Sequence, residues 1–429
     1  LAEAGLPTDS ILSRIVADPA VVDSIKRAYQ RVEASLVAID PRTGHVKAWV
    51  GGRDFAQNKY DHVSMSKRQP GSTFKPFVYA AALDYGFSPD DVLLDEIVEY
   101  VDPQTHRRWA PRNVGRVSGE PTSLRDALAF SKNTITAQLT LQLGPDRVAS
   151  YAQRMGIESE MQRYPSIGLG TSEVTLLELV SAYGTIASLG THRDPVVVTR
   201  IEDRHGRTLA TFPTESQGAL SPHTTYTLLD MMRGVVDYGT GARIRSVFGA
   251  SGDLAAKTGT SQDGADGWFV LMHPQLVTGA WVGFSSPAVT FRSSYWGQGA
   301  HNALYVVGDF YRDADLPRDV RFEAPAGYRV PQATQFAYAS EDSLGDDLFG
   351  DSLAWGDYDT LDWRDVEDLD LSDSELDAAA RDTADAELAG EEAPVPEDEL
   401  TEADRLNRME REQNGVGRLL DEIQEDGSD

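Results

Sequence analysis

Hydrophobic positions along residues 31–335 change from strand-like to helix-like spacing and back. Two apolar runs, Ser35–Ile39 and Val46–Val50, flank the turn sequence Asp40-Pro41-Arg42-Thr43-Gly44 and predict a β-hairpin. Further apolar runs predict strands at Val196–Glu202, Thr208–Phe212, Ala255–Thr260, Asp266–His273 and Val277–Phe284. Helical spacing predicts helices at residues 72–85, Leu124–Leu143, Leu176–Ser188 and Thr224–Val236. Strands at both ends with helices between indicate an α+β fold, with an antiparallel β-sheet flanked by helices.

Charge divides the chain into a near-neutral body and an acidic end. Residues 341–429 hold 32 Asp and Glu against six Arg and no Lys, and so carry 26 of the 29 net negative charges. Such dense like charge cannot support a packed core. We therefore expect a helical approach segment or linker over residues 1–30, one globular domain over 31–335, and a mostly disordered acidic tail over 336–429.

The acidic tail has a second interpretation. Aromatic side chains embedded in acidic sequence near Trp355 and Trp363 are typical of a short motif that folds on a basic protein partner. Like-charge repulsion argues against contact of the tail with nucleic acid or anionic lipid.

The chain has no Cys, which excludes disulfides, thiolate catalysis and Cys-ligated metals.

Three short motifs carry the candidate chemistry. They are Ser72-Thr73-Phe74-Lys75, Ser131-Lys132-Asn133 and Lys257-Thr258-Gly259-Thr260. Their order and their separations of 59 residues (Ser72 to Ser131) and 126 residues (Ser131 to Lys257) are hard to obtain by chance. Together they match the S-x-x-K, S-x-N and K-T-G set of penicillin-recognising serine acyltransferases.

The residue types in these motifs suit nucleophilic catalysis by a serine. A serine hydroxyl needs an adjacent base, and spacing i, i+3 on a helix places Lys75 one turn from Ser72. Burial and the positive charge of Lys257 would lower the pKa of Lys75, so that it can accept the serine proton. Ser131 offers a hydroxyl for relaying a proton, and the amide of Asn133 can hold a substrate peptide bond.

The third motif is typical of a strand edge that binds a carboxylate. Gly259 permits close approach of a ligand to the backbone, and the hydroxyls of Thr258 and Thr260 suit a carboxylate together with Lys257. Backbone N–H groups of Ser72 and Thr260 are the candidates for an oxyanion hole. This chemistry uses protein groups alone, so we expect no cofactor and no metal. Asp263 and Asp266 are interpreted as turn and strand-edge residues.

The motifs and their surroundings resemble the transpeptidase domain of bifunctional (class A) penicillin-binding proteins. Around the nucleophile the chain reads Arg68-Gln69-Pro70-Gly71-Ser72-Thr73-Phe74-Lys75-Pro76-Phe77. Other matching stretches are Trp49-Val50-Gly51-Gly52, Pro111-Arg112-Asn113, Gly168–Val174, Ala182-Tyr183, Gln262–Phe269 and Trp281-Val282-Gly283. The resemblance covers about residues 30 to 312.

The resemblance implies a serine D,D-transpeptidase that cross-links peptidoglycan stem peptides. Ser72 would form an acyl-enzyme from a D-Ala-D-Ala stem peptide and pass it to the amine of a second peptide. β-Lactams would acylate the same serine. Ser131 would carry the proton toward the leaving D-Ala, while Thr258 and Thr260 bind the terminal carboxylate.

The resemblance leaves two alternatives open. A D,D-carboxypeptidase or a β-lactamase would give the same acyl-enzyme to water, although Glu173 has the context of a structural loop residue and not of a water-activating base. A catalytically idle scaffold or sensor domain would show a broken motif, and all three motifs are intact.

The resemblance also implies an N-terminal membrane anchor and a glycosyltransferase domain before this region. The chain begins at Leu1, and none of its apolar runs is as long as the roughly 20 residues that a membrane-spanning helix needs. We therefore expect a natural or designed fragment of a longer protein. That protein would be anchored at the extracytoplasmic face of the bacterial cytoplasmic membrane.

Overall fold

The structure, a computed structural model, describes residues 15–103 and 105–332. Its central sheet is antiparallel, with the strand order β11-β12-β13-β1-β2. The strands span β1 Val32–Ile39, β2 Val46–Val50, β11 Ala255–Thr260, β12 Gly267–His273 and β13 Leu276–Phe284. Strand β1 pairs with β13, so segments more than 200 residues apart lie side by side, with Ser35 opposite Trp281. The predicted α+β fold with an antiparallel sheet is confirmed.

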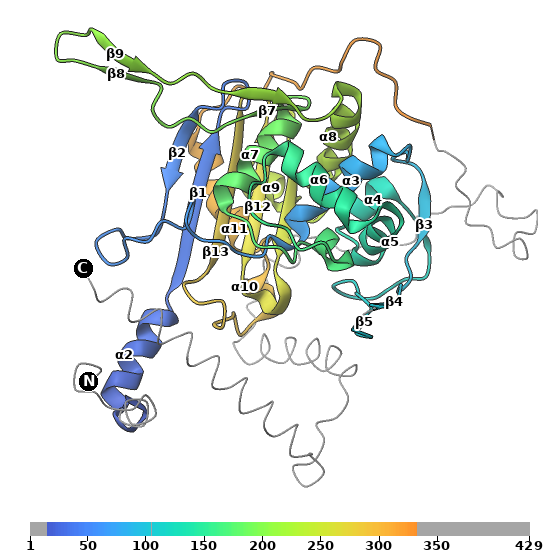
Figure 1. Ribbon diagram of the computed structural model, residues 1–429, viewed down its shortest axis with the longest axis horizontal. Helices are drawn as coiled ribbons and strands as arrows, with labels where there is room; N and C mark the ends of the chain where they lie inside the picture. The colour runs from blue at the N-terminus through green and yellow to red at the C-terminus, as the bar shows by residue number, and fades with distance from the viewer. Residues whose placement is uncertain (1–14, 104, 333–429) are drawn as a thin grey trace, which may run out of the picture. The chain divides into compact units, whose positions relative to one another are not determined.

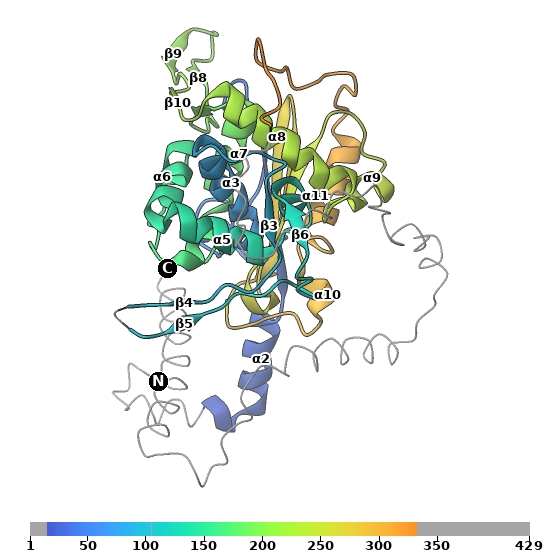
Figure 2. The same cartoon turned by 90° about the vertical axis from the view of Figure 1, so that its right-hand side faces the viewer.

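Helices cover both faces of this sheet (Figures 1 and 2). The larger set comprises α3 Lys75–Asp84, α4 Leu124–Ala129, α5 Asn133–Leu143, α6 Pro145–Met155, α7 Leu176–Ala187 and α8 Pro222–Asp237. On the opposite face lie α9 Arg243–Ser246 and α11 Ala303–Asp313. Because side chains alternate along a strand, Trp268 and Val270 of β12 join the first core, and Phe269 and Leu271 join the second.

Side-chain caps fix where the helices α7 and α8 begin. The Thr175 hydroxyl accepts from the backbone N–H of Glu178, and the Glu178 carboxylate accepts from the backbone N–H of Thr175. This reciprocal capping box stabilises the start of α7 by about 1 kcal/mol. Ser221 caps α8 in a similar way, ahead of Pro222 at the first helical position. Both helices lie within two residues of their predicted bounds.

The prediction of one continuous helix over Leu124–Leu143 is wrong. Helix α4 ends after Ala129, and Ser131 has a left-handed φ of 58°. The backbone N–H groups of Ser131 and Lys132 donate to the carbonyls of Leu128 and Ala127, which is the hydrogen-bond pattern of a Schellman motif. Glycine usually occupies the left-handed position of this motif, and here a serine does, so the residue type does not indicate a helix end. The helical apolar spacing also continues across the break, which is why one helix was predicted.

Short elements complete the described region. Two-stranded pairs are formed by β3 Val92–Leu94 with β6 Pro121–Ser123, β4 Tyr100–Val101 with β5 Arg108–Trp109, β7 Thr191–Arg193 with β10 Ser216–Gly218, and β8 Arg200–Glu202 with β9 Thr208–Thr211. The β8–β9 hairpin matches two predicted strands, whereas α6 and α11 were not predicted.

The structure describes part of the predicted approach segment and none of the predicted tail. Helix α2 spans Pro19–Tyr29, within the predicted approach segment 1–30. Residues 1–14 and the predicted tail, 336–429, lie outside the described residues, so the tail stays a prediction. Within the described residues, every helix is too short or too polar to cross a membrane.

Candidate active site

Ser72 lies in a tight turn that packs against the end of the edge strand β11. The turn is the 3-10 helix η2, Gly71–Phe74, and the backbone N–H of Lys75 donates to the carbonyl of Ser72 as α3 begins. Gly71 has a φ of 53°, and a Cβ there would lie 2.1 Å from the Thr260 carbonyl oxygen. Only glycine combines this backbone conformation with this close approach. The turn therefore brings the backbone of Ser72 to the end of the third motif.

Two buried aromatic side chains hold the same turn from other directions. The Trp268 indole N–H donates to the carbonyl of Gln69 at 2.9 Å. The Tyr183 hydroxyl donates to the carbonyl of Thr73 at 2.7 Å, and burial raises the pKa of Tyr183 well above its usual value. Tyr183 therefore remains a neutral hydrogen-bond donor. Both residues lie in stretches that carry the family resemblance, but their role in holding the turn was not predicted.

The three motifs meet at Ser131. The Lys75 Nζ lies 2.5 Å from the Ser131 carbonyl oxygen and 2.6 Å from the Asn133 Oδ1. The Lys257 Nζ donates to the Ser131 Oγ at 2.9 Å, and the Lys75 Nζ lies 3.2 Å from that same oxygen. The left-handed backbone of Ser131 turns both its carbonyl and its hydroxyl toward the lysine amines. Three sequence segments spread over 189 residues thus form one polar cluster.

Both lysines are fully buried, with 0% of their surface exposed. Burial lowers the pKa of Lys75 well below its ordinary value, and the nearby charge of Lys257 lowers it further. Burial also lowers the pKa of Lys257, to about 7. Within the described region, their hydrogen-bond partners are carbonyl, amide and hydroxyl oxygens, all of them neutral. A neutral Lys75 amine beside a protonated Lys257 is the charge state that this arrangement favours.

The end of β11 presents the two predicted threonine hydroxyls. The Thr258 hydroxyl forms a 2.7 Å hydrogen bond with the Thr240 hydroxyl, and the Thr260 hydroxyl accepts from the backbone N–H of Gly299 at 3.2 Å. A Cβ on Gly259 would lie 2.6 Å from the Pro70 carbonyl oxygen, so this glycine lets β11 approach the nucleophile turn. Thr240 follows helix α8 outside any motif, and the sequence offered no signal for it.

The acidic residues near the motifs have structural roles. Asp266 is buried and accepts hydrogen bonds from the Trp281 indole and the Ser261 hydroxyl, as expected for a strand-edge residue. Asp263 lies in the turn η4, Gln262–Gly264, with a φ of 60°. Glu173 is exposed, next to the bridge between Val174 and Arg68. Among the described residues there is no group of three or more His, Asp or Glu side chains arranged to hold a metal.

Sequence comparison finds a matching family and longer relatives among known proteins. The family described as penicillin binding protein transpeptidase domain matches residues 34–282. Penicillin-binding protein 1A of Pseudomonas aeruginosa is 32% identical over 316 residues, which cover 62% of this chain and 38% of that protein. Penicillin-binding protein 1A of Aquifex aeolicus is 38% identical over 253 residues, covering 59% and 34%. The chain thus spans a little over a third of the length of these curated relatives.

Solved structures show the same fold. Penicillin-binding protein 1A from Haemophilus influenzae superposes with a TM-score of 0.63 at 25% identity, covering 68% of this chain and 49% of that one. The PonA1 protein from Mycobacterium tuberculosis, solved in complex with penicillin V, superposes with a TM-score of 0.60 at 24% identity. That alignment covers 73% of this chain and 86% of PonA1.

Proposed function

Because the chain belongs to the penicillin-binding protein transpeptidase family, we propose that it is a serine D,D-transpeptidase acting on peptidoglycan stem peptides. In this proposal the acyl group is carried on Ser72, and β-lactams inhibit the enzyme by acylating the same serine. The observation that carries the proposal is the meeting of two buried lysine amines on Ser131. One of them, Lys75, follows Ser72 by one helical turn. Such a cluster has a cost in stability, and it is suited to accepting a proton from a serine.

Lys75 is the base in the acylation step. A neutral amine has two N–H bonds and one lone pair, and two oxygen acceptors lie 2.5 and 2.6 Å from the Lys75 Nζ. These two nearest acceptors take both N–H bonds of the neutral amine. The third contact, with the Ser131 Oγ at 3.2 Å, is longer, and the lone pair is the group that would take the Ser72 proton. The Ser72 Oγ then attacks the carbonyl carbon of the D-Ala-D-Ala peptide bond. Backbone N–H groups of Ser72 and Thr260 would stabilise the resulting oxyanion, and the close approach of Gly71 to the Thr260 carbonyl supports this assignment.

Ser131 returns the proton to the leaving group. Its hydroxyl accepts from Lys257 and lies within hydrogen-bond reach of Lys75, so it can pass a proton along this chain of groups. When the C–N bond breaks, the Ser131 Oγ donates its proton to the departing D-Ala nitrogen and recovers one from Lys75. The amine of a second stem peptide then attacks the ester and releases Ser72.

The edge strand β11 binds the donor peptide. Among the described residues no strand pairs with its outer edge, which permits an extended peptide to add to the sheet. Thr258, Thr260 and the positive charge of Lys257 would hold the terminal carboxylate, with Gly259 allowing close approach. Asn133 orients the donor peptide from the opposite side. This chemistry requires no cofactor.

The longer protein to which this domain belongs would have a glycosyltransferase domain and an N-terminal anchor. Its transpeptidase domain would lie at the extracytoplasmic face of the cytoplasmic membrane. The acidic tail would recruit a basic protein partner. The glycosyltransferase domain, the anchor and the location rest on the similarity to penicillin-binding protein 1A relatives, which are longer than this chain. The role of the tail rests on its acidic sequence with embedded aromatic residues.

Incubation with a labelled penicillin tests the proposal directly. We expect one adduct per chain in the intact mass, and we expect proteolysis to map it to the peptide that contains Ser72. A label on any other residue, or none at saturating drug, would show that the proposed nucleophile is wrong.

The acyl-enzyme should persist for many minutes after free drug is removed. Hydrolysis needs a group that activates water, and a carboxylate beside the site amines would be the usual one. Within the described residues the hydrogen-bond partners of these amines are neutral oxygens and none is a carboxylate. The measurement is the rate at which the intact mass returns to the unmodified value. Return within seconds would favour the β-lactamase alternative, and rapid release of D-Ala to water from a stem peptide would favour the carboxypeptidase.

The rate of acylation should depend on pH with a maximum. The rate rises with pH as Lys75, whose pKa is lowered, loses its proton and becomes a base. It falls again as Lys257 loses its charge near its pKa of about 7. Second-order rate constants measured across pH 5–10 test this profile. Lys257→Arg should remove the falling limb because arginine stays charged, and a falling limb unchanged in Lys257→Arg would contradict the assignment.

A further inference from the structure

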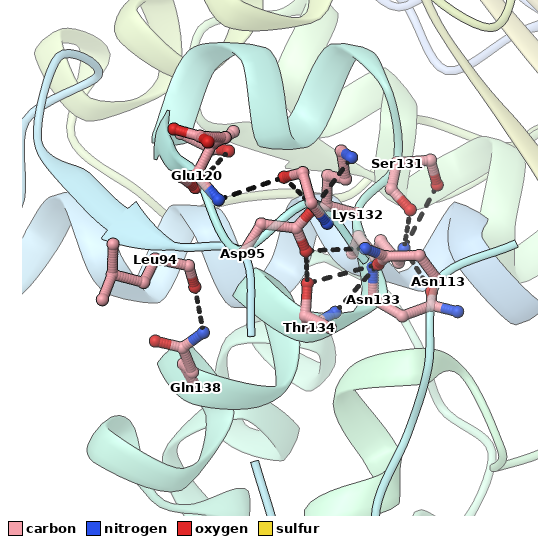
Figure 3. A network of polar contacts seen from close by, with 12 residues as sticks. Leu94, Asp95, Asn113, Glu120, Ser131, Lys132, Asn133, Thr134 and Gln138 are labelled. Atoms are coloured by element: carbon pink, nitrogen blue, oxygen red, sulfur yellow. Dashed lines mark hydrogen bonds and ion pairs between the residues drawn. The ribbon is translucent and has the colours of Figure 1, made fainter. Parts of the chain in front are cut away.

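A loop outside the three motifs holds the Ser131-Lys132-Asn133 turn in place. The loop runs from β3 to β6, and its residue Asp95 is fully buried. Figure 3 shows Asp95 between the side chains of Lys132 and Thr134. The Lys132 Nζ donates to one carboxylate oxygen at 2.9 Å, and the Thr134 hydroxyl donates to the other at 2.5 Å. Both contacts lie directly beside Asn133, which interacts with Lys75.

Asn113 of the same loop caps helix α5 from outside the helix. Lys132 at the N-cap position supplies no side-chain acceptor, so the first N–H groups of α5 need another partner. The Asn113 Oδ1 accepts from the backbone N–H groups of Asn133 at 2.7 Å and Thr134 at 3.2 Å. The Asn113 Nδ2 donates to Asp95 at 2.7 Å, which fixes which end of the amide faces the helix.

The orientation of the Asn133 side chain follows from this cap. Its Nδ2 donates to the carbonyl of Arg112, the neighbour of Asn113, at 2.7 Å. The amide oxygen is thereby directed to the Lys75 Nζ. Ser131, two residues earlier, has a left-handed backbone that an L-residue adopts only when its surroundings enforce it. The loop thus orients Asn133 directly. It reaches the Ser131 turn, which the Schellman hydrogen bonds close, through the ion pair of Lys132 with Asp95.

The charge on Asp95 is maintained inside the protein. Burial alone would raise its pKa, but hydrogen bonds from Thr134, Lys132 and Ser118 outweigh burial and hold the pKa of Asp95 well below its usual value. An ionised carboxylate at the start of α5 also interacts favourably with the positive end of the helix dipole. Around neutral pH the Asn113 amide therefore donates to an ionised carboxylate.

We propose that Asp95 and Asn113 are positioning residues for acylation, which orient Asn133, and through Lys132 the Ser131 turn, against Lys75 without contacting the substrate. This inference rests on the proposed function for its effect on rate. It assigns a part in that function to two residues outside the motifs, Asp95 and Asn113, which lie 38 and 20 positions before Asn133. Their contact with the site runs entirely through the start of α5.

Asn113→Ala tests the inference by separating rate from folding. At saturation, the number of labels per chain reports the folded fraction, whereas the second-order rate constant reports the geometry of the folded site. We expect close to one label per chain, acquired about 10- to 100-fold more slowly than in the parent protein. Gln138→Ala is the matched control, because Gln138 anchors the same loop at the Leu94 carbonyl without touching the start of α5. It should label at the parent rate.

Exchanging the side chains at positions 95 and 113 should restore the acylation rate that a single substitution lowers. Asn113→Asp keeps an acceptor for the α5 N–H groups but faces Asp95 with a second carboxylate, and it should label slowly. The double variant Asp95→Asn with Asn113→Asp restores one donor and one acceptor with the net charge unchanged. Its rate should recover toward that of the parent. A double variant no faster than Asn113→Asp, or an Asn113→Ala variant whose labelled fraction falls while its rate constant stays at the parent value, would overturn the inference.

Hydrogen exchange tests the cap independently of penicillin. In the parent protein the amides of residues 133 and 134 should be protected, and Asn113→Ala should increase their exchange about tenfold or more. Gln138→Ala should leave them unchanged. Unaltered exchange in Asn113→Ala overturns the inference even where acylation fails, whereas a parent protein that no β-lactam labels refutes the proposed function alone.

Discussion

Replacing Ser72 by Ala is expected to abolish covalent labelling by penicillin. The acyl bond in the proposed mechanism forms on the Ser72 Oγ, and alanine has no atom there. Ser72 is only half-buried, and the turn that carries it is held by Gly71, Trp268 and Tyr183. The free energy of unfolding should therefore change by less than about 0.5 kcal/mol. Labelling at saturating drug and thermal unfolding of the same sample measure the two effects.

Ser131→Ala is the comparison for this result. It removes a hydroxyl from the same cluster but leaves the nucleophile, so labelling should be slowed and not abolished. Labelling of Ser72→Ala at the parent level would mean that the drug reacts elsewhere. A large loss of stability in Ser72→Ala would mean that missing label reports unfolding and not chemistry.

Replacing Lys75 by Arg is expected to lower the rate of acylation almost as much as replacing it by Ala. The proposed role requires a neutral amine, and the guanidinium of arginine does not lose its proton in proteins. Loss of a general base typically costs about 10²- to 10⁴-fold in rate. The second-order rate constant for labelled penicillin, measured at the pH of maximal rate, is the observable.

Lys257→Arg is the matched control, because both lysines are fully buried and both contact Ser131. The role proposed for Lys257 is electrostatic, and arginine keeps the charge, so acylation should remain measurable. Equal losses at the two positions would show that steric fit in the buried cluster, and not proton transfer, limits the Lys75 variant.

The sheet was predictable from the sequence because its strands carry strong local signals. Strands β1 and β2 are apolar runs joined by an Asp-Pro-Arg-Thr-Gly turn, and β11, β12 and β13 follow one another through short turns. Their observed bounds differ from the predicted ones by no more than three residues. Helix α6 was missed because Gly144-Pro145 indicates the end of one helix and, equally, the start of the next.

The motifs predicted that Lys75, Ser131, Asn133 and Lys257 lie together, as the structure has them, but not how the chain holds them. The left-handed backbone of Ser131 depends on a Schellman motif in which a serine replaces the usual glycine, so no residue type announces it. The cap on α5 comes from Asn113, twenty residues away, and that contact exists only after the loop folds against the helix. Local sequence patterns report propensity and spacing, whereas these features arise from tertiary contacts.

The buried lysine pair couples folding to proton release. In the unfolded chain both amines return to an ordinary pKa of 10.5, while in the folded protein that of Lys257 is about 7 and that of Lys75 is well below its ordinary value. Between about pH 7 and 10.5 the unfolded chain thus binds more protons, and the contribution of these two groups to the free energy of unfolding rises with pH. Around neutral pH the lowered pKa values that make Lys75 a base also make the native state easier to unfold. Reactivity and resistance to unfolding are therefore opposed at the same two nitrogen atoms.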